Sequence, residues 1–467
     1  MRNSTSSVGG KRTETFPSKP LHNFYYKPML NFNIMNKIST TMNTSKRWAW
    51  LTMLLIGILA IGTVSCNEDD DDNGAPVDPG TEVESAWLTG FRKGTPQGRL
   101  YYMEVNEEIP SETSLSNSIE LGLNARIISY GEHPYTWNDN AVTLTKWDVN
   151  RTTLELSANS VMSFASTGIT NGFATTFVSD TKAYVQNIPE GIIVEFNPTL
   201  MEITEVIEFD FPFPQPPNGE YFHRKYYAEE TGKIIYTIQY FITGCCEYDG
   251  PREFNIMVFD TETNTVEFKQ SQNGMLVEND LVQSDDGFLY TSPSLFQAIA
   301  KKYLTGVPDS PASDFSVLRM DLDGNIDPDY SLDLSELLSA EFARAFEVSP
   351  SNNVRPFIVT NNDFADTWDE RFAIFNDFTE WEIVGVNYVT GEVTPITAFD
   401  GFNYVISPSE IDGEDYAIVG RVELTSDEDN AQVEQEVSYL VRIEDGFNIT
   451  LLTRNPGGTL MHSSKLW

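Results

Sequence analysis

The chain has 467 residues, of which 30 are lysine or arginine and 69 are aspartate or glutamate, and its formal net charge is −39. Such an acidic surface repels nucleic-acid phosphates and anionic lipid headgroups, so it argues against a nucleic-acid-binding protein and against membrane binding through the protein surface. A hydrophobic fraction of 40% with 12% aromatic residues excludes a disordered chain outside the N-terminal region.

The N-terminal region has the layout of a lipoprotein signal. The basic pair Lys46-Arg47 precedes an apolar run over 51–62, and small residues follow directly before Cys66. Because a membrane-spanning helix needs about 20 apolar residues, we predict a signal peptide over 42–65 and a lipid on the Cys66 thiol, so that the chain is anchored and does not span. We interpret residues 1–41 as a mis-assigned upstream segment.

An acidic run over 67–72 follows Cys66. Residues 66–84 are rich in Asp, Gly and Pro, which favours a flexible tether, because such a composition buries too little apolar surface to fold. An acidic cluster directly after a lipid-bearing cysteine also resembles the surface-export signal of Bacteroidota lipoproteins. That resemblance implies display on the outer face of the outer membrane.

A repeated pattern of strand, turn and strand organises residues 85–467. In most copies an Asp or Asn follows an apolar residue, which suits a turn because these side chains hydrogen-bond their own turn backbone. The copies recur at about the spacing of four-stranded propeller blades. Their anchor residues are Asn106, Asp148, Asn197, Asp260, Asp321, Asn387 and Glu444.

A second hairpin pattern precedes several of these anchors, at 179–185, 230–236 and 284–290. Two hairpins per unit give four strands per unit. We therefore predict an all-β fold, a β-propeller of seven blades with four antiparallel strands each. The C-terminal strand near 460–467 is expected to complete the blade that begins around 87–105, since closure protects the edges. Six or eight blades, or a pair of long β-sandwiches, are the alternatives.

Three segments interrupt the strand pattern. Apolar residues at helical spacing predict a helical insert over 295–304 and a helical crossover between blades over 334–346. Residues 361–381 combine six aromatic residues with acids and without strand alternation. This last segment is either a helix-containing loop packed on a blade or a lid over a binding face.

The adjacent pair Cys245-Cys246 cannot join distant segments. It forms a vicinal disulfide or stays reduced and buried, and two neighbouring thiols are not a structural zinc site, which needs four ligands. The loop that starts at Asp321 has its glycine at the wrong position for an EF-hand, so we interpret it as a turn and expect no bound metal.

No nucleophile elbow, zinc-binding helix, phosphate loop or dinucleotide fingerprint is present in the sequence. We therefore predict a protein without enzymatic activity and without a cofactor. Paired carboxylates of a glycosidase stay open, because the many acids do not single out a pair.

The stretches 125–131, 176–184 and 193–198 resemble a family of Bacteroidota surface lipoproteins whose β-propellers are linked to siderophore uptake. The resemblance implies a surface protein that captures a ferric siderophore and passes it to a TonB-dependent outer-membrane transporter.

A ferric siderophore is usually anionic, so a binding face on this acidic chain should concentrate the scarce basic residues together with aromatic ones. The candidates are Arg126, Tyr130, His133, Tyr221, His223, Arg224, Lys225, Tyr226 and Arg355. The rival functions are a scaffold or adhesin that binds protein or glycan, and an enzyme of the glycosidase or quinoprotein-like class.

Overall fold

The computed structural model describes most of the chain from residue 81 onward. The described residues are 81–467 except 96–97, 124, 171, 173–174, 215–218, 243–246, 249, 251–252, 272–280, 293–301, 307–315, 331, 341, 346–352, 361–381, 399–400, 403, 412–413, 427–431 and 445–446. They belong to one compact unit, Pro79–Trp467. The predictions for 1–65, Cys66, Cys245, Cys246 and 361–381 lie outside the described residues, as does 295–301 of the expected helical insert.

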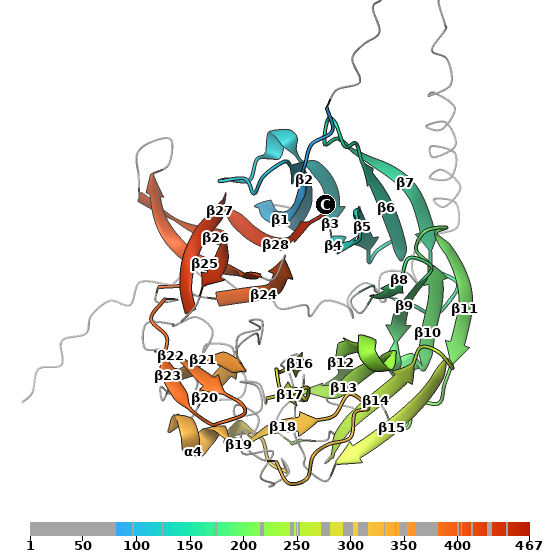
Figure 1. Ribbon diagram of the computed structural model, residues 1–467, viewed down its shortest axis with the longest axis vertical. Helices are drawn as coiled ribbons and strands as arrows, with labels where there is room; N and C mark the ends of the chain where they lie inside the picture. The colour runs from blue at the N-terminus through green and yellow to red at the C-terminus, as the bar shows by residue number, and fades with distance from the viewer. Residues whose placement is uncertain are drawn as a thin grey trace, which may run out of the picture. The chain divides into compact units, whose positions relative to one another are not determined.

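Seven antiparallel sheets of four strands each surround a common axis, which confirms the predicted seven-bladed β-propeller (Figure 1). In the order from the innermost to the outermost strand, the first three blades consist of β4 (Ala125–Tyr130), β5 (His133–Asn138), β6 (Thr143–Val149) and β7 (Leu156–Ser163); of β8 (Thr176–Ser179), β9 (Lys182–Asn187), β10 (Ile192–Asn197) and β11 (Glu202–Glu208); and of β12 (Gly219–Ala228), β13 (Lys233–Ile242), β14 (Phe254–Asp260) and β15 (Thr265–Ser271). The next three consist of β16 (Val282–Gln283), β17 (Leu289–Thr291), β18 (Ser316–Met320) and β19 (Leu332–Asp333); of β20 (Phe342–Ala345), β21 (Val354–Thr360), β22 (Glu382–Asn387) and β23 (Val393–Pro395); and of β24 (Tyr404–Ile411), β25 (Glu414–Ser426), β26 (Gln432–Glu444) and β27 (Asn448–Pro456). The closing blade consists of β28 (Gly458–Lys465), β1 (Trp87–Thr95), β2 (Gly98–Asn106) and β3 (Ile119–Leu123).

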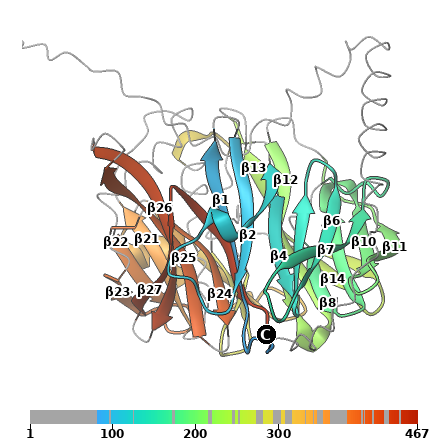
Figure 2. The same cartoon turned by 90° about the horizontal axis from the view of Figure 1, so that it is seen from above.

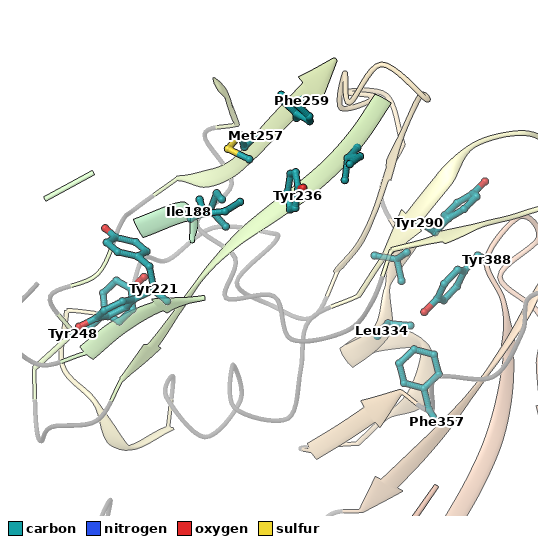
Figure 3. Packing of buried hydrophobic residues seen from close by; sticks show 14 of the residues in the cluster. Ile188, Tyr221, Tyr236, Tyr248, Met257, Phe259, Tyr290, Leu334, Phe357 and Tyr388 are labelled. Atoms are coloured by element: carbon teal, nitrogen blue, oxygen red, sulfur yellow. The ribbon is translucent and has the colours of Figure 1, made fainter. Parts of the chain in front are cut away.

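The position of a strand in its blade follows from its sequence. Strand β14, Phe-Asn-Ile-Met-Val-Phe-Asp, is buried along nearly its whole length, because neighbouring blades cover both of its faces. The outer strand β11, Glu-Ile-Thr-Glu-Val-Ile-Glu, exposes its glutamates to solvent. The hydrophobic core therefore consists of clusters packed between successive blades, of which the largest includes Tyr184, Tyr236 and Tyr290 (Figure 3).

The two rims of the ring differ in what they connect. We call the upper rim the end of the blades that carries the connections from second to third strands and from one blade to the next. The lower rim carries the turns within the two hairpins of each blade, and the C-terminus also lies there (Figure 2). Strands β13, β17 and β21 end at the upper rim, and β14, β18 and β22 start there.

The ring closes as predicted. The C-terminal strand β28 is the innermost strand of the blade that holds β1, with pairs from Trp87–Lys465 to Lys93–Gly458. Backbone hydrogen bonds join Ala86 N to the Trp467 carbonyl at 3.3 Å and Leu466 N to the Ala86 carbonyl at 2.8 Å. Chain start and chain end of the propeller are thus fixed together at the lower rim.

Helices are short in the described part of the chain. They include the 3₁₀ turns η1 (Leu115–Asn117), η2 (Ile188–Glu190) and η3 (Glu229–Thr231), and the α-helix α4 (Leu334–Leu338). Lys302 and Tyr303, within the expected helical insert, are helical as well. The expected helix over 334–346 is too long. Asp333 caps α4 at its start, Ser339 ends it with a left-handed φ of 50°, and β20 follows. Its place between two blades agrees with the predicted crossover.

The sequence anchors mark the third strand of every blade. Asn197, Asp260, Asp321 and Asn387 each accept hydrogen bonds from backbone N–H groups of their own turn, at 2.8 to 3.0 Å. The three predicted upstream hairpins are those of β8–β9, β12–β13 and β16–β17. The hydrogen bonds within these turns therefore explain why the sequence motif predicts the number of blades.

One anchor is misplaced. Asp148 lies inside β6, and Asn150 supplies the turn oxygen, which accepts from Thr152 N at 2.8 Å and Thr153 N at 3.0 Å. The pairing of β6 with β7 shifts between Lys146 and Trp147, where Asn159 of β7 is the extra residue. In the closing blade Asn106 ends β2, but a long connection with η1 replaces the tight turn.

These lower-rim turns also join the blades. The turn that follows a third strand accepts hydrogen bonds from side chains of the preceding blade. Tyr184 Oη donates to the Thr261 carbonyl at 3.2 Å, Lys269 Nζ to the Asp323 carbonyl at 2.7 Å, and Tyr330 Oη to the Tyr388 carbonyl at 2.6 Å. The repeated motif is thus a structural device that ties each blade to its neighbour.

Candidate functional site

The innermost strand β12 carries five of the nine predicted site residues, and its alternation divides them between two seams. Successive side chains of a strand point to opposite faces. Lys225 contacts Thr176 of β8, whereas Tyr226 Oη donates to Gln283 Oε1 of β16 at 2.6 Å. His223 lies on the face of Lys225, and Arg224 on the face of Tyr226. The β12 site, as we name this region, therefore has two halves.

In the first half, Lys225 binds the neighbouring blade. Its Nζ donates to the carbonyl of Thr175 and, at 2.6 Å, to Thr176 Oγ1. The ring of His223 packs edge-on against Tyr236, with centroids 5.5 Å apart. Burial, followed by the nearby cations Lys225 and Arg224, lowers the pKa of His223 to about 3. The imidazole is therefore neutral at physiological pH.

The pair formed by His223 and Gln186 leaves hydrogen-bonding capacity unused. His223 Nε2 lies 3.3 Å from Gln186 Nε2. His223 Nδ1 and Gln186 Oε1 are both shielded from solvent, and neither has a hydrogen-bond partner among the described residues. Exchanging the amide atoms of Gln186 does not remove the deficit, since one atom of each side chain still lacks a partner. Buried polar atoms of this kind call for a ligand or an ordered water.

The second half, toward β16–β19, is also polar near the upper rim. Thr237 and Gln239 of β13 are fully buried, and Gln239 Nε2 donates to Thr237 Oγ1 at 3.3 Å. Gln239 Oε1 has no partner within the part of the chain that the structure describes. Arg224 lies directly opposite Thr237 in the register. Below this level the same seam is apolar and contains Ile235 with its neighbours.

An aromatic cluster covers the upper end of the β12 site. The ring of Tyr221 lies 5.3 Å from Phe211 and 5.7 Å from Tyr240, and Tyr240 lies 5.8 Å from Tyr248. Figure 3 shows Tyr221 and Tyr248 close together, with Tyr236 farther along β13. Two glycines leave space for the Tyr240 ring, because a Cβ would lie only 2.4 Å from the ring at Gly219 and 2.0 Å from it at Gly250.

The other predicted residues lie elsewhere in the ring. Arg126, near the upper rim, forms an ion pair with Asp139 at 3.3 Å. Tyr130 stacks on Phe177 with centroids 4.6 Å apart. His133 lies at the lower rim, where its Nδ1 is 3.2 Å from the Trp147 carbonyl oxygen. The structure therefore spreads these three along one blade and does not bring them to β12.

Arg355 lies on the second strand of another blade. It is buried, at 4% exposure, and pairs in register with Val386 of β22. The blade β16–β19 separates it from β12 in the ring. Whether any of the nine residues contacts a ligand stays a prediction.

Sequence reasoning missed Gln186, Thr237 and Gln239. Each is a polar residue inside a strand that is otherwise apolar and buried, such as Ala183-Tyr184-Val185-Gln186 in β9. A polar side chain at a core position of a central strand is the sequence signal that would have identified them.

The described residues contain no group of three or more His, Cys, Asp and Glu that could hold a metal ion. Asp321, the start of the loop considered for calcium, binds the backbone of its own turn. No described helix combines the length and the apolar character that a bilayer crossing requires.

Comparison with known proteins identifies no family. No family model and no curated protein matches the chain. Among solved structures, the periplasmic gluconolactonase PpgL from Pseudomonas aeruginosa is similar at 11% identity and a TM-score of 0.49, over 82% of this chain and 99% of that one. A putative 6-phosphogluconolactonase from Bacteroides fragilis gives 12% and 0.41, over 84% and 99%. AztD from Citrobacter koseri gives 10% and 0.37, over 82% and 98%. At such identities the likeness extends to the propeller fold alone.

Proposed function

We propose that this chain is a non-enzymatic binding protein, anchored to the cell surface by a lipid on Cys66, which holds an oxygen-rich anionic small molecule at the β12 site. A ferric siderophore is the ligand we favour, and a TonB-dependent outer-membrane transporter is the partner. This proposal combines the geometry around β12 with the family resemblance of the sequence.

The observation that carries the proposal is the incomplete pairing of His223 and Gln186. A neutral imidazole and an amide, both buried and each with one unmatched polar atom, can hydrogen-bond a ligand without the cost of desolvating a charge. Two adjacent cations, Arg224 and Lys225, supply a local positive potential. Such a combination suits carboxylate, catecholate or hydroxamate oxygens.

The net charge of −39 opposes the approach of an anionic chelate. Salt screens long-range repulsion beyond about 8 Å at physiological ionic strength, whereas the contacts at β12 are short and partly buried. We therefore expect the association rate to rise with added salt. A ligand held only by surface cations would show the opposite dependence.

The segment before β1 and the polar part of the β12 site lie at different rims. Val83 N donates to the Arg151 carbonyl at 2.9 Å, so the described residues N-terminal to β1 reach the ring at the lower rim. The polar halves of the β12 site lie toward the upper rim.

The experiment is binding of the unit Pro79–Trp467 to a panel of ferric siderophores, followed by tryptophan fluorescence and by calorimetry. We expect at least one ligand to bind. The variant Gln186→Met should weaken binding about tenfold or more, since about 1.4 kcal/mol of hydrogen bonding corresponds to one decade. The matched control Arg442→Gln removes a cation that pairs with Glu414 and Glu444 far from β12, and should bind normally.

The outcomes separate the parts of the proposal. No response across the panel removes siderophore capture. Binding that is equal in Gln186→Met and in the unchanged protein removes the β12 site but leaves capture at another place.

A further inference from the structure

The outer edges of the seven blades differ in how they are protected. An exposed edge strand offers unpaired N–H and C=O groups to another strand, and proteins guard against this with charge, proline, short length or a covering segment. Strand β11 carries three glutamates, β15 has Glu267 and Lys269, and β3 has Glu120. The strands β19 and β23 have only two and three residues.

The outer strand β27 is covered. Residues from the long connection after β2 lie along it, with Thr113 N donating to the Arg454 carbonyl at 3.0 Å and Arg454 N to the Ser111 carbonyl at 2.9 Å. This segment satisfies part of the edge that β27 would otherwise present to solvent.

The remaining outer strand, β7, has none of these protections. It is eight residues long, Leu-Ser-Ala-Asn-Ser-Val-Met-Ser, and mostly exposed, with Val161 at 62%. Among the described residues no strand pairs with its outer edge (Figure 1). A bulge at Asn159 interrupts its register, but β3, β11 and β27 also contain bulges. The difference therefore lies in its side chains.

The lack of charge extends beyond the strand. Residues 156–179 contain no Asp, Glu, Lys, Arg or His, in a chain in which 21% of residues are charged. On the neighbouring strand, Asp148 accepts a hydrogen bond from Asn159 Nδ2 at 2.5 Å and lies 3.5 Å from His133 Nδ1. The exposed Glu155 precedes β7, and the strand itself carries no charge.

We propose that β7 is an interaction edge that pairs with β7 of a second copy of this chain. Two copies with a net charge of −39 each repel one another wherever acidic surfaces meet, so an uncharged edge is the place where they can approach. An antiparallel pair of identical strands is a two-fold symmetric contact. It joins the blades β4–β7 of both rings into one continuous sheet, along a strand of about 27 Å.

The chemistry of the edge favours a second copy over an unrelated protein. A strand that recognises an unrelated acidic protein would carry lysines, which attract the carboxylates of that protein. Strand β7 has no lysine. Small side chains such as Ser157, Ala158 and Ser160 let two edges come together without a clash. Because one strand pair is a small contact, we expect a weak dimer.

The first test is the mass of the unit Pro79–Trp467 in sedimentation equilibrium from about 1 μM to about 1 mM, the range of weak interfaces. We expect the average mass to rise toward twice that of the monomer. The variant Val161→Lys, which places like charges across the new strand pair, should stay monomeric. The matched control is Val206→Lys on β11, an exposed valine (43%) on the neighbouring outer strand, which should dimerise normally.

The second test locates the contact. In a background with Cys245→Ser and Cys246→Ser, the single variants Ser160→Cys and Val161→Cys should give disulfide-linked dimers under mild oxidation, and Val206→Cys should not. A mass that stays monomeric throughout overturns the proposal. So does a dimer that Val161→Lys leaves intact or that forms equally through Val206→Cys. Neither result depends on siderophore binding.

Discussion

The lower and the upper rim of the propeller are built on opposite principles. The lower rim repeats one device, a turn capped by Asp or Asn whose carbonyl accepts a hydrogen bond from the blade before it. The upper rim holds the aromatic cluster around Tyr221 and the unmatched polar atoms of His223 and Gln186. Stability thus concentrates where the sequence repeats, and the candidate binding chemistry lies where it does not.

The largest effect is expected at the lower rim. Tyr184→Ala removes a buried ring that packs on Phe259 with centroids 4.9 Å apart, together with hydrogen bonds to Thr261 and Asn264. We expect a loss of about 3–5 kcal/mol in the free energy of unfolding, measured by urea denaturation. Tyr184→Phe keeps the ring and should lose about 1–2 kcal/mol. A cost below 1 kcal/mol for the alanine variant would mean that this seam is not essential.

The second largest loss of stability is expected at the seam between β26 and β28, where the closing blade meets the blade before it. The hydroxyl of Ser438 donates to the Gly458 carbonyl at 3.1 Å and accepts from Asn455 Nδ2 at 3.3 Å and from Leu460 N at 2.7 Å. Ser438→Ala leaves these buried groups without a partner and should cost about 1–3 kcal/mol. The control Ser157→Ala, on the exposed strand β7, should change the urea midpoint little. Equal midpoints for the two variants would contradict the expectation.

Acid should weaken the ring through its interior histidines. Burial lowers the pKa of His462 to about 4 and contributes most to lowering that of His223 to about 3. Because the unfolded chain binds a proton below about pH 6.5 and the folded chain does not, this stability is present above pH 6.5 and is lost as the pH falls toward 4. His462→Gln should flatten that loss by about 1–3 kcal/mol at pH 4, measured by urea denaturation across pH. Parallel pH profiles would contradict it.

The upper rim should tolerate change. Phe213→Ala alters a half-buried ring of the aromatic cluster, 6.1 Å from Tyr221, and should cost less than about 1.5 kcal/mol. A cost as large as that of Tyr184→Ala would erase the contrast between the rims.

The anchor should not affect folding at all. Cys66→Ser is expected to abolish metabolic labelling of the protein by a fatty acid and to leave the urea midpoint unchanged. A serine variant that still takes up the label would contradict lipid attachment at this residue.

The fold could be predicted because its repeats contain turns that are stabilised by their own Asp or Asn side chains. Asn197, Asp260, Asp321 and Asn387 mark four blades through contacts within their own turns, which do not depend on distant residues. The misplaced anchor Asp148 has a different cause. Strand β6 continues to Val149, so Asn150, two residues farther on, supplies the turn oxygen, and the length of a strand depends on its pairing with its neighbours.

The candidate site could be predicted only in part. A concentration of basic and aromatic residues directed the site prediction to β12, but strand alternation sends His223 and Arg224 to different seams. Gln186 reaches His223 from another blade, and such a contact between strands far apart in the chain has no signature in one sequence. The uncharged run over 156–179 is visible in the sequence, yet its meaning depends on β7 being an outer strand.

The pairing of β28 with β1 sets an order of events for a newly made molecule. Because β28 is made long after β1, the inner edge of β1 stays unpaired during synthesis until β28 follows. A chain that stops even one strand early would lack the innermost strand of its first blade. We expect cells to degrade such shortened chains, and newly made molecules to become resistant to proteases only after Lys465 has been added and β28 can pair with β1.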